Sequence, residues 1–122
     1  MSNHESQIQF LGYEVLKFQF DQSTSGGKSG WNFYPEVRIT SLGNNVLRGE
    51  VLLSANTFCM VEKGKPCSVS VLLRGLFEGK DMTQEMFEQH CLVKGSAYLV
   101  SPLRTLVTDF LAKVRSLPDD VI

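Results

Sequence analysis

The sequence contains few of the residues that build disulfide frameworks, metal centres or strongly charged surfaces. Its three cysteines, Cys59, Cys67 and Cys91, are an odd number at wide spacings, so they form neither a paired framework nor a CxxC motif. Twelve Lys and Arg residues stand against thirteen Asp and Glu residues, and the net charge of -1 lacks the positive field that phosphate binding requires. These shortages predict a cytoplasmic protein without a metal, a cofactor or a nucleic-acid partner.

Long apolar stretches are missing as well. No window of the sequence approaches the roughly 18 apolar residues of a membrane-spanning helix, and residues 1–9 lack a basic region followed by an apolar run. Neither secretion nor membrane insertion is therefore predicted. A chain of 122 residues with 43% hydrophobic and 20% charged residues is typical of a single globular domain, here residues 1–122.

The first two thirds of the chain alternate apolar and polar residues with the period of β-strands. In the first segment, Leu16, Phe18 and Phe20 are expected on one face and Val15, Lys17 and Gln19 on the other. Strands are expected over Phe10–Phe20, Glu36–Leu42, Val46–Phe58 and Ser68–Glu78.

Segments rich in turn-forming residues separate these strands. Gln22–Gly30 is rich in glycine and serine and predicts a long flexible crossover. Trp31–Pro35 is apolar but is expected to be irregular, because its proline denies a sheet one hydrogen bond. Gly43-Asn44-Asn45 predicts a tight hairpin turn, since these residues tolerate positive φ.

After Gly79 the apolar period changes to that of helices. Asp81 and Gln84 resemble a capping box, which predicts a first helix starting near Asp81. Ser101-Pro102 is typical of a helix start, and the amphipathic segment that follows predicts a second helix. Strands first and helices last predict an α+β domain, in which a four-stranded antiparallel meander with a long first crossover precedes two C-terminal helices on one face.

Catalytic motifs are weak throughout the sequence. His90 and Cys91 are neighbours on a predicted helix, so their side chains point about 100° apart and do not form a nucleophile pair. Gly27-Lys28-Ser29 lacks the earlier glycine and the following helix of a phosphate-binding loop. The chain is therefore not expected to be an enzyme, and its excess of apolar side chains instead predicts a surface for another subunit or a ligand.

Several short segments occur in an order that resembles a known family. They are Trp31, Pro35-Glu36-Val37, Val46–Thr57, Gly75-Leu76-Phe77, His90-Cys91-Leu92, Leu99–Arg104 and Leu117-Pro118. Their order and spacing, which cover nearly the whole chain, resemble the bacterial SecB protein-export chaperones. No single motif is decisive.

This resemblance implies an ATP-independent holdase that binds unfolded preproteins in the cytoplasm and delivers them to the SecA translocation motor. It implies a homotetramer, built as a dimer of dimers. The client groove would be lined by Trp31, Phe33, Tyr34, Leu76, Phe77, Leu99 and Leu103. The contacts between subunits would be made by Tyr13, Val15, Lys17, Gln19, Met86, His90 and Cys91.

Departures from the family pattern suggest other functions. Two extra residues, Phe33 and Tyr34, precede Pro35, and the acidic sheet surface on which SecA docks in the family is replaced here by residues such as Ser70 and Arg74. A SecB-like chaperone dedicated to another client, such as an antitoxin, fits these departures. Two alternatives remain: a hot-dog-type small-ligand enzyme or binding protein, which requires an early helix wrapped by later strands, and a purely structural oligomer.

Overall fold

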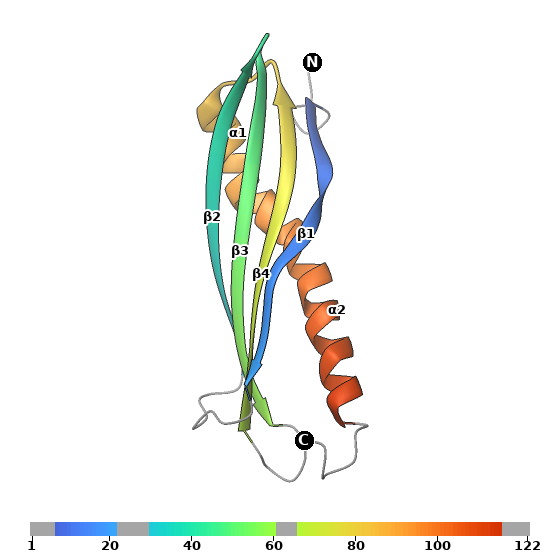
Figure 1. Cartoon of the computed structure of the whole chain (residues 1–122). Coiled ribbons are helices and arrows are strands. Elements are labelled where there is room, and N and C mark those ends of the chain that lie inside the picture. Colours follow the sequence, from blue (N-terminus) through green and yellow to red (C-terminus); the bar gives the residue numbers. More distant parts are fainter. Residues whose placement is uncertain (1–6, 22–29, 61–65, 116–122) are drawn as a thin grey trace.

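The computed structural model describes residues 7–21, 30–60 and 66–115 (Figure 1). Its strands are β1 (Ile8–Asp21), β2 (Gly30–Gly43), β3 (Val46–Met60) and β4 (Pro66–Lys80). They are followed by α1 (Gln84–His90), the π turn η2 (Cys91–Gly95) and α2 (Ser96–Arg115). All neighbouring strands are antiparallel in the order β1-β4-β3-β2, so β2, β3 and β4 form a meander and β1 lies beside β4. The predicted α+β class is confirmed.

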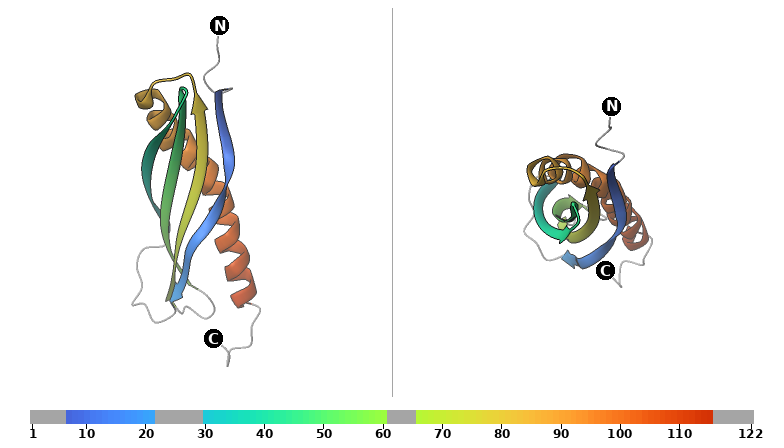
Figure 2. Two further views of the ribbon diagram at one scale, coloured as in Figure 1. Left: turned by 45° about the horizontal axis from the view of Figure 1, so that its top comes forward. Right: turned by 90° about the horizontal axis from the view of Figure 1, so that it is seen from above.

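The helical elements cover one face of the strongly twisted sheet and cross it diagonally (Figure 2). α1 contacts β2 and β3, whereas α2 contacts β3 and β4. Farther along α2, the Phe110 ring meets the Phe18 and Phe20 rings of β1 at centroid distances of 4.8 and 5.1 Å. The helical run therefore begins over the β2 side of the sheet and ends over the β1 side.

The strand β2 begins earlier than its sequence indicates. Trp31–Pro35, which was expected to be irregular, belongs to β2 and pairs residue by residue with β3 from Thr57 to Leu53. The reason is that β2 is an edge strand, where a proline without an N–H group is tolerated. The rest of the predicted crossover, residues 22–29, lies outside the described residues.

Two bulges change the face pattern of β1. The register with β4 shifts between Phe10 and Gly12 and again between Val15 and Lys17, so Leu11 and Leu16 are extra residues. Gly12 has a φ of 125°, a conformation that suits glycine. Because residues directly opposite each other share a face, Val15 lies on the helix side together with Phe18, and this differs from the predicted alternation.

The predicted turn between β2 and β3 is confirmed by its backbone geometry. Asn44 and Asn45 have φ values of 54° and 61°, and Gly43 pairs with Val46. Two consecutive positive φ angles are the signature of a type I′ turn, whose twist matches that of the strands that it joins.

The two predicted helices form one continuous helical run. Thr83, rather than Asp81, is the N-cap, and its hydroxyl accepts a hydrogen bond of 3.2 Å from the Met86 N–H. Asp81 has a φ of 55° and belongs to the connection before the helix. Pro102, expected near a helix start, lies inside α2. Burial of Leu99 and Leu103 on the sheet outweighs the one backbone hydrogen bond that a proline removes.

Three glycines form a floor on which the helical run rests closely; we call Gly49, Gly75 and Gly79 the glycine floor. A Cβ atom at Gly49 would lie 2.8 Å from the Cys91 sulfur, and one at Gly75 would lie 2.9 Å from Leu99. Around this floor, the helix-side residues of β3 and β4 form the core: Val51, Leu53, Ala55, Cys67, Val69, Val71, Leu73 and Phe77.

Candidate peptide-binding surface

The residues predicted to line a client groove fall into three different places. Phe77, Leu99 and Leu103 are fully buried between the sheet and the helical run, so they belong to the core and offer a client no surface. Tyr34 and Leu76 lie on the opposite, outer face of the sheet, across from Ser54 and Glu50. Trp31 and Phe33 remain on the helix side, where they are half-buried.

An aromatic pair and an arginine meet at the helix side of β2; we call Trp31, Phe33 and Arg104 the β2 corner. The rings of Trp31 and Phe33 are nearly parallel, with an interplanar angle of 2° and centroids 5.6 Å apart. They share a face because they are two residues apart on one strand. The guanidinium carbon of Arg104, which comes from α2, lies 5.7 Å from the centroid of the Phe33 ring. This cation–π contact contributes about 0.5–1 kcal/mol at a partly exposed site.

A second apolar surface lies at the opposite edge of the sheet, on the helix side of β1. It consists of Phe10, Tyr13, Val15 and Tyr98, and we call it the β1 patch. Their exposed fractions are 41%, 50%, 45% and 55%. The Phe10 ring contacts the buried Phe77 ring in a tilted arrangement, with centroids 5.0 Å apart, and stacks on Tyr98, with centroids 6.0 Å apart. Tyr98 comes from α2 and lies beside this part of β1, and the four side chains nevertheless remain exposed.

The other residues predicted to contact a neighbouring subunit differ in exposure. Lys17 and Gln19 are exposed and lie on the outer face of β1, opposite Leu72 and Ser70. On α1, Met86 is 42% exposed and His90 is half-buried, and burial lowers the pKa of His90. Cys91 is fully buried, and burial raises the pKa of its thiol to about 12, so it contributes to the core and not to a surface.

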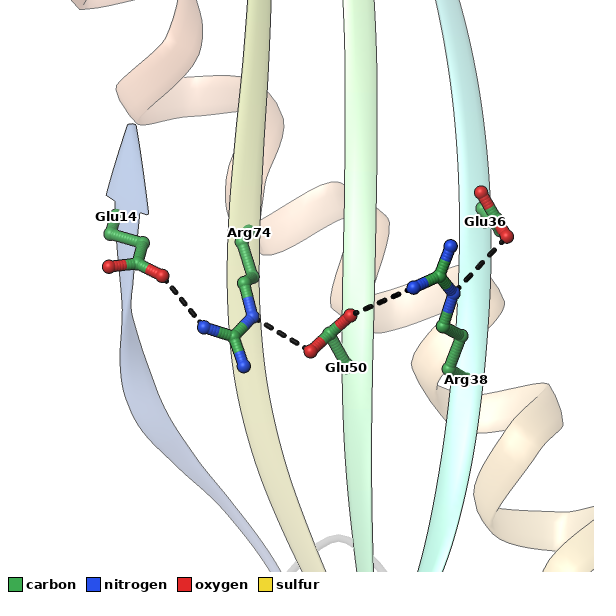
Figure 3. A network of polar contacts seen from close by, with 5 residues as sticks. All are labelled: Glu14, Glu36, Arg38, Glu50 and Arg74. Atoms are coloured by element: carbon green, nitrogen blue, oxygen red, sulfur yellow. Dashed lines mark hydrogen bonds and ion pairs between the residues drawn. The ribbon is translucent and has the colours of Figure 1, made fainter. Parts of the chain in front are cut away.

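The outer face of the sheet carries a row of alternating charges across all four strands (Figure 3). Arg74 of β4 donates to Glu14 of β1 and to Glu50 of β3, both at 2.8 Å. Arg38 of β2 continues the row, 3.8 Å from Glu50 and 3.4 Å from Glu36. The hydrogen bonds that Arg74 donates to Glu14 and Glu50 raise the pKa of Arg74. Carboxylates on this face are therefore matched with arginines rather than forming an acidic surface.

Sequence reasoning missed Arg104 as part of a site. In the sequence, Arg104 stands out only as the last residue of the family-like segment Leu99–Arg104, and its helical phase alone does not tell which strand lies beside it. The position of Arg104 can be inferred only when the direction in which α2 crosses the sheet is known. Leu103 then faces the core, Phe110 faces β1, and Arg104 lies on the side of the helix toward β2.

Residues 7–21, 30–60 and 66–115 contain no group of three or more His, Cys, Asp or Glu side chains placed to hold a metal ion. Within those same ranges, no helix has the length and apolar character needed to cross a membrane.

A sheet in the order β1-β4-β3-β2, followed by one helical run on a single face, is a SecB-like fold. One solved structure with this likeness is the Mycobacterium tuberculosis Rv1957 SecB-like chaperone in complex with a ChAD peptide from the Rv1956 HigA1 antitoxin. The match has a TM-score of 0.61, covers 93% of this chain and 87% of that chain, and has 13% sequence identity. No protein-family model and no curated protein matches the sequence. The likeness therefore concerns the fold.

Proposed function

We propose that this chain is an ATP-independent chaperone that holds an unfolded polypeptide segment, and that its client is an antitoxin-type segment. The observation that carries the proposal is the β2 corner, where two stacked, half-buried aromatic rings lie on the helix side of a SecB-like sheet. Clustered aromatic side chains that are not fully buried suit a binding surface better than a core. Holding a segment requires no reacting group.

Binding at this corner would depend on apolar burial. A client ring that joins Trp31 and Phe33 gains about 25 cal/mol for each Å² of apolar surface removed from water, and part of this gain is lost to ordering of the client. One such contact is weak and reversible. A folded client hides its apolar side chains in its own core, so folding itself releases it.

The outer face favours an antitoxin-type client over delivery to SecA. The resemblance to the SecB family implies that SecA would dock on an acidic sheet surface. Here Glu14, Glu36 and Glu50 are paired with Arg38 and Arg74 on that face. The structurally similar Rv1957 chaperone is in complex with a peptide from an antitoxin. Protein export through SecA is the second candidate, supported by the SecB-like fold.

We assign the β1 patch to contacts between copies of this chain in the bacterial cytoplasm. Three exposed apolar side chains on one face of the edge strand β1, together with Tyr98 of α2, are a surface that a second copy covers well. Lys17 and Gln19 would lie at the rim of this interface. Met86 and His90 of α1 would form the second interface of a tetramer, arranged as a dimer of dimers.

Native mass spectrometry tests the proposal in one series. The purified chain is measured alone, with a reduced and carboxymethylated unfolded protein, with an antitoxin-derived segment, and with SecA. We expect a tetramer that retains the two unfolded polypeptides and does not retain SecA. A monomer that binds none of them contradicts the proposal, and retention of SecA favours the export function instead.

A pair of variants locates the binding surface. Trp31→Ser removes one ring of the stacked pair and should weaken retention of the unfolded polypeptide about ten-fold, the effect of losing a central aromatic contact. Tyr34→Ser is the matched control, because Tyr34 is 58% exposed and lies on the outer face. Equal binding by both variants would show that the client lies elsewhere.

A further inference from the structure

We infer that Arg104 makes the β2 corner selective for client segments in which an acidic side chain lies two residues from an aromatic side chain. This inference rests on the proposed function and specifies its client. The segment is defined by its chemistry: an aromatic residue, then any one residue, then Asp or Glu, in either chain direction. The identity of the protein that carries the segment is not specified.

The charge of Arg104 distinguishes it from the arginines of the sheet. Arg38, Arg48 and Arg74 each lie within 4 Å of a Glu carboxylate. For Arg104, the described part of the chain offers no carboxylate within that distance, and the recorded contact of its guanidinium is the Phe33 ring. An exposed positive charge thus lies directly beside the stacked rings, with no anion of the described chain assigned to it.

The guanidinium of Arg104 lies over the Phe33 ring in a position that suits an anion. A guanidinium that places its face over an aromatic ring keeps its N–H donors directed outward from its edge. Those donors match the two oxygens of a carboxylate, and the resulting charge-assisted pair is stronger than a neutral hydrogen bond. The guanidinium carbon of Arg104 lies over the Phe33 ring, so its N–H donors remain available to an anion while the ring beneath stays apolar.

The spacing between Arg104 and the two rings matches that of an extended client chain. The guanidinium carbon lies 5.7 Å from the Phe33 centroid, and the Trp31 and Phe33 centroids are 5.6 Å apart. In an extended chain, residues two apart share a face and are separated by about 6.6 Å. A client that places an aromatic ring on the Trp31–Phe33 pair therefore brings the side chain two residues away to the distance of the guanidinium.

Selectivity follows from the combination of the two contacts. A ring alone binds by burial, and a carboxylate alone on an exposed arginine contributes little. When a bound ring excludes water beside Arg104, the ion pair strengthens because the local dielectric falls. A basic side chain at the same position is repelled.

Short peptides test this inference. Their N-termini are acetylated and their C-termini are amidated, so that only a side chain can supply the carboxylate. Fluorescence anisotropy with the full chain compares a peptide containing Trp-Ser-Glu with peptides containing Trp-Ser-Gln, Trp-Ser-Lys and Ala-Ser-Glu. We expect the Glu peptide to bind about ten-fold more tightly than the Gln peptide, which corresponds to one charge-assisted hydrogen bond. The Lys and Ala peptides should bind more weakly still. A fifth peptide, ending in Trp-Ser with a free carboxylate, separates a terminal from a side-chain anion.

Variants of the chain assign the preference to Arg104. Arg104→Gln should abolish the difference between the Glu and Gln peptides, and Arg104→Lys should keep part of it, because charge remains but the planar stack is lost. Lys113→Gln is the matched control, since it removes a positive charge from an exposed position of the same helix. It should leave the preference unchanged.

The outcomes separate this inference from the proposed function. If the Glu and Gln peptides bind equally, or if Arg104→Gln keeps the preference, the role of Arg104 is overturned while the chaperone function stands. If none of the peptides binds but the chain retains an unfolded protein, the inference is again overturned and the function stands. If the chain retains neither the peptides nor an unfolded protein, both are overturned.

Discussion

The closeness of α1 to the sheet predicts that Gly79→Ala destabilises the protein. A Cβ atom at position 79 would lie 2.6 Å from Cδ1 and 2.8 Å from Cε1 of Phe87, distances that require a displacement. The Phe87 ring is fully buried and cannot retreat toward β3, because it already lies 2.9 Å from the place of a Cβ at Gly49. The glycine floor therefore holds the ring on two neighbouring strands.

Two effects of opposite sign determine how much Gly79→Ala changes the free energy of unfolding. Replacing glycine by alanine stabilises a protein by about 0.4–1 kcal/mol through the unfolded chain where the backbone and the space allow it. Overpacking a core costs about 1–3 kcal/mol. The second effect is larger, so the free energy of unfolding should fall by roughly 1–2 kcal/mol, with Tm lower by roughly 4 °C for each kcal/mol.

Urea denaturation followed by circular dichroism measures this change. Gly95→Ala is the comparison variant, since its Cβ would lie 3.3 Å from Phe77 and Val51, a milder overlap, and alanine favours a helical backbone. Its loss of stability should be smaller than that of Gly79→Ala. Phe87→Leu should cost less in the Gly79→Ala background than in the native chain, because the smaller side chain relieves the contact. A Gly79→Ala protein as stable as the native chain would refute the close seating of α1.

Two further predictions concern the core and the outer face. Burial raises the pKa of the Cys91 thiol from 9.0 to about 12, so its contribution to stability is complete below pH 9 and is lost as the pH rises toward 12. Iodoacetamide labelling located by mass spectrometry should therefore reach Cys91 at the rate of unfolding, and Cys91→Ala should flatten the fall in stability above pH 9; rapid labelling of the folded chain would contradict this. Glu50→Gln removes the carboxylate shared by Arg38 and Arg74 and should lower the urea midpoint at low salt, with a smaller difference in 1 M NaCl. A difference that is unchanged by salt would show that packing, and not charge pairing, is responsible.

The central strands were predictable from the sequence because each of them has a neighbour on both sides. β3 and β4 bury one face without interruption, so the alternation of Val51, Leu53 and Ala55 directly reports the structure. The edge strand β1 was less predictable, since bulges at Leu11 and Leu16 break the period of two on which the inference depends. Because Pro102 was interpreted as a helix start, the sequence predicted two separate helices. In the structure the helix continues through Pro102, since its apolar side chains pack on the sheet.

The candidate site was predictable in part. Trp31 and Phe33 were identified as surface aromatic residues, and the structure places them together. Phe77, Leu99 and Leu103 were assigned to the same surface, because an apolar residue in a periodic pattern does not tell whether a second layer covers it. Arg104 joins the site from a helix distant in sequence, a relation that depends on the angle at which α2 crosses the sheet.

The bulges of β1 also affect how readily this protein, which is proposed to hold unfolded chains, aggregates by adding strands at its sheet edges. An exposed, uninterrupted edge strand is a template on which other strands add without limit, as in amyloid fibres. On β1 the register shifts after Phe10 and again after Val15, and on the other edge Pro35 lacks an N–H donor. An added strand keeps its register for only a few residues at either edge. Such edges support a short, closed pairing and resist the continuous ladder of a growing fibre.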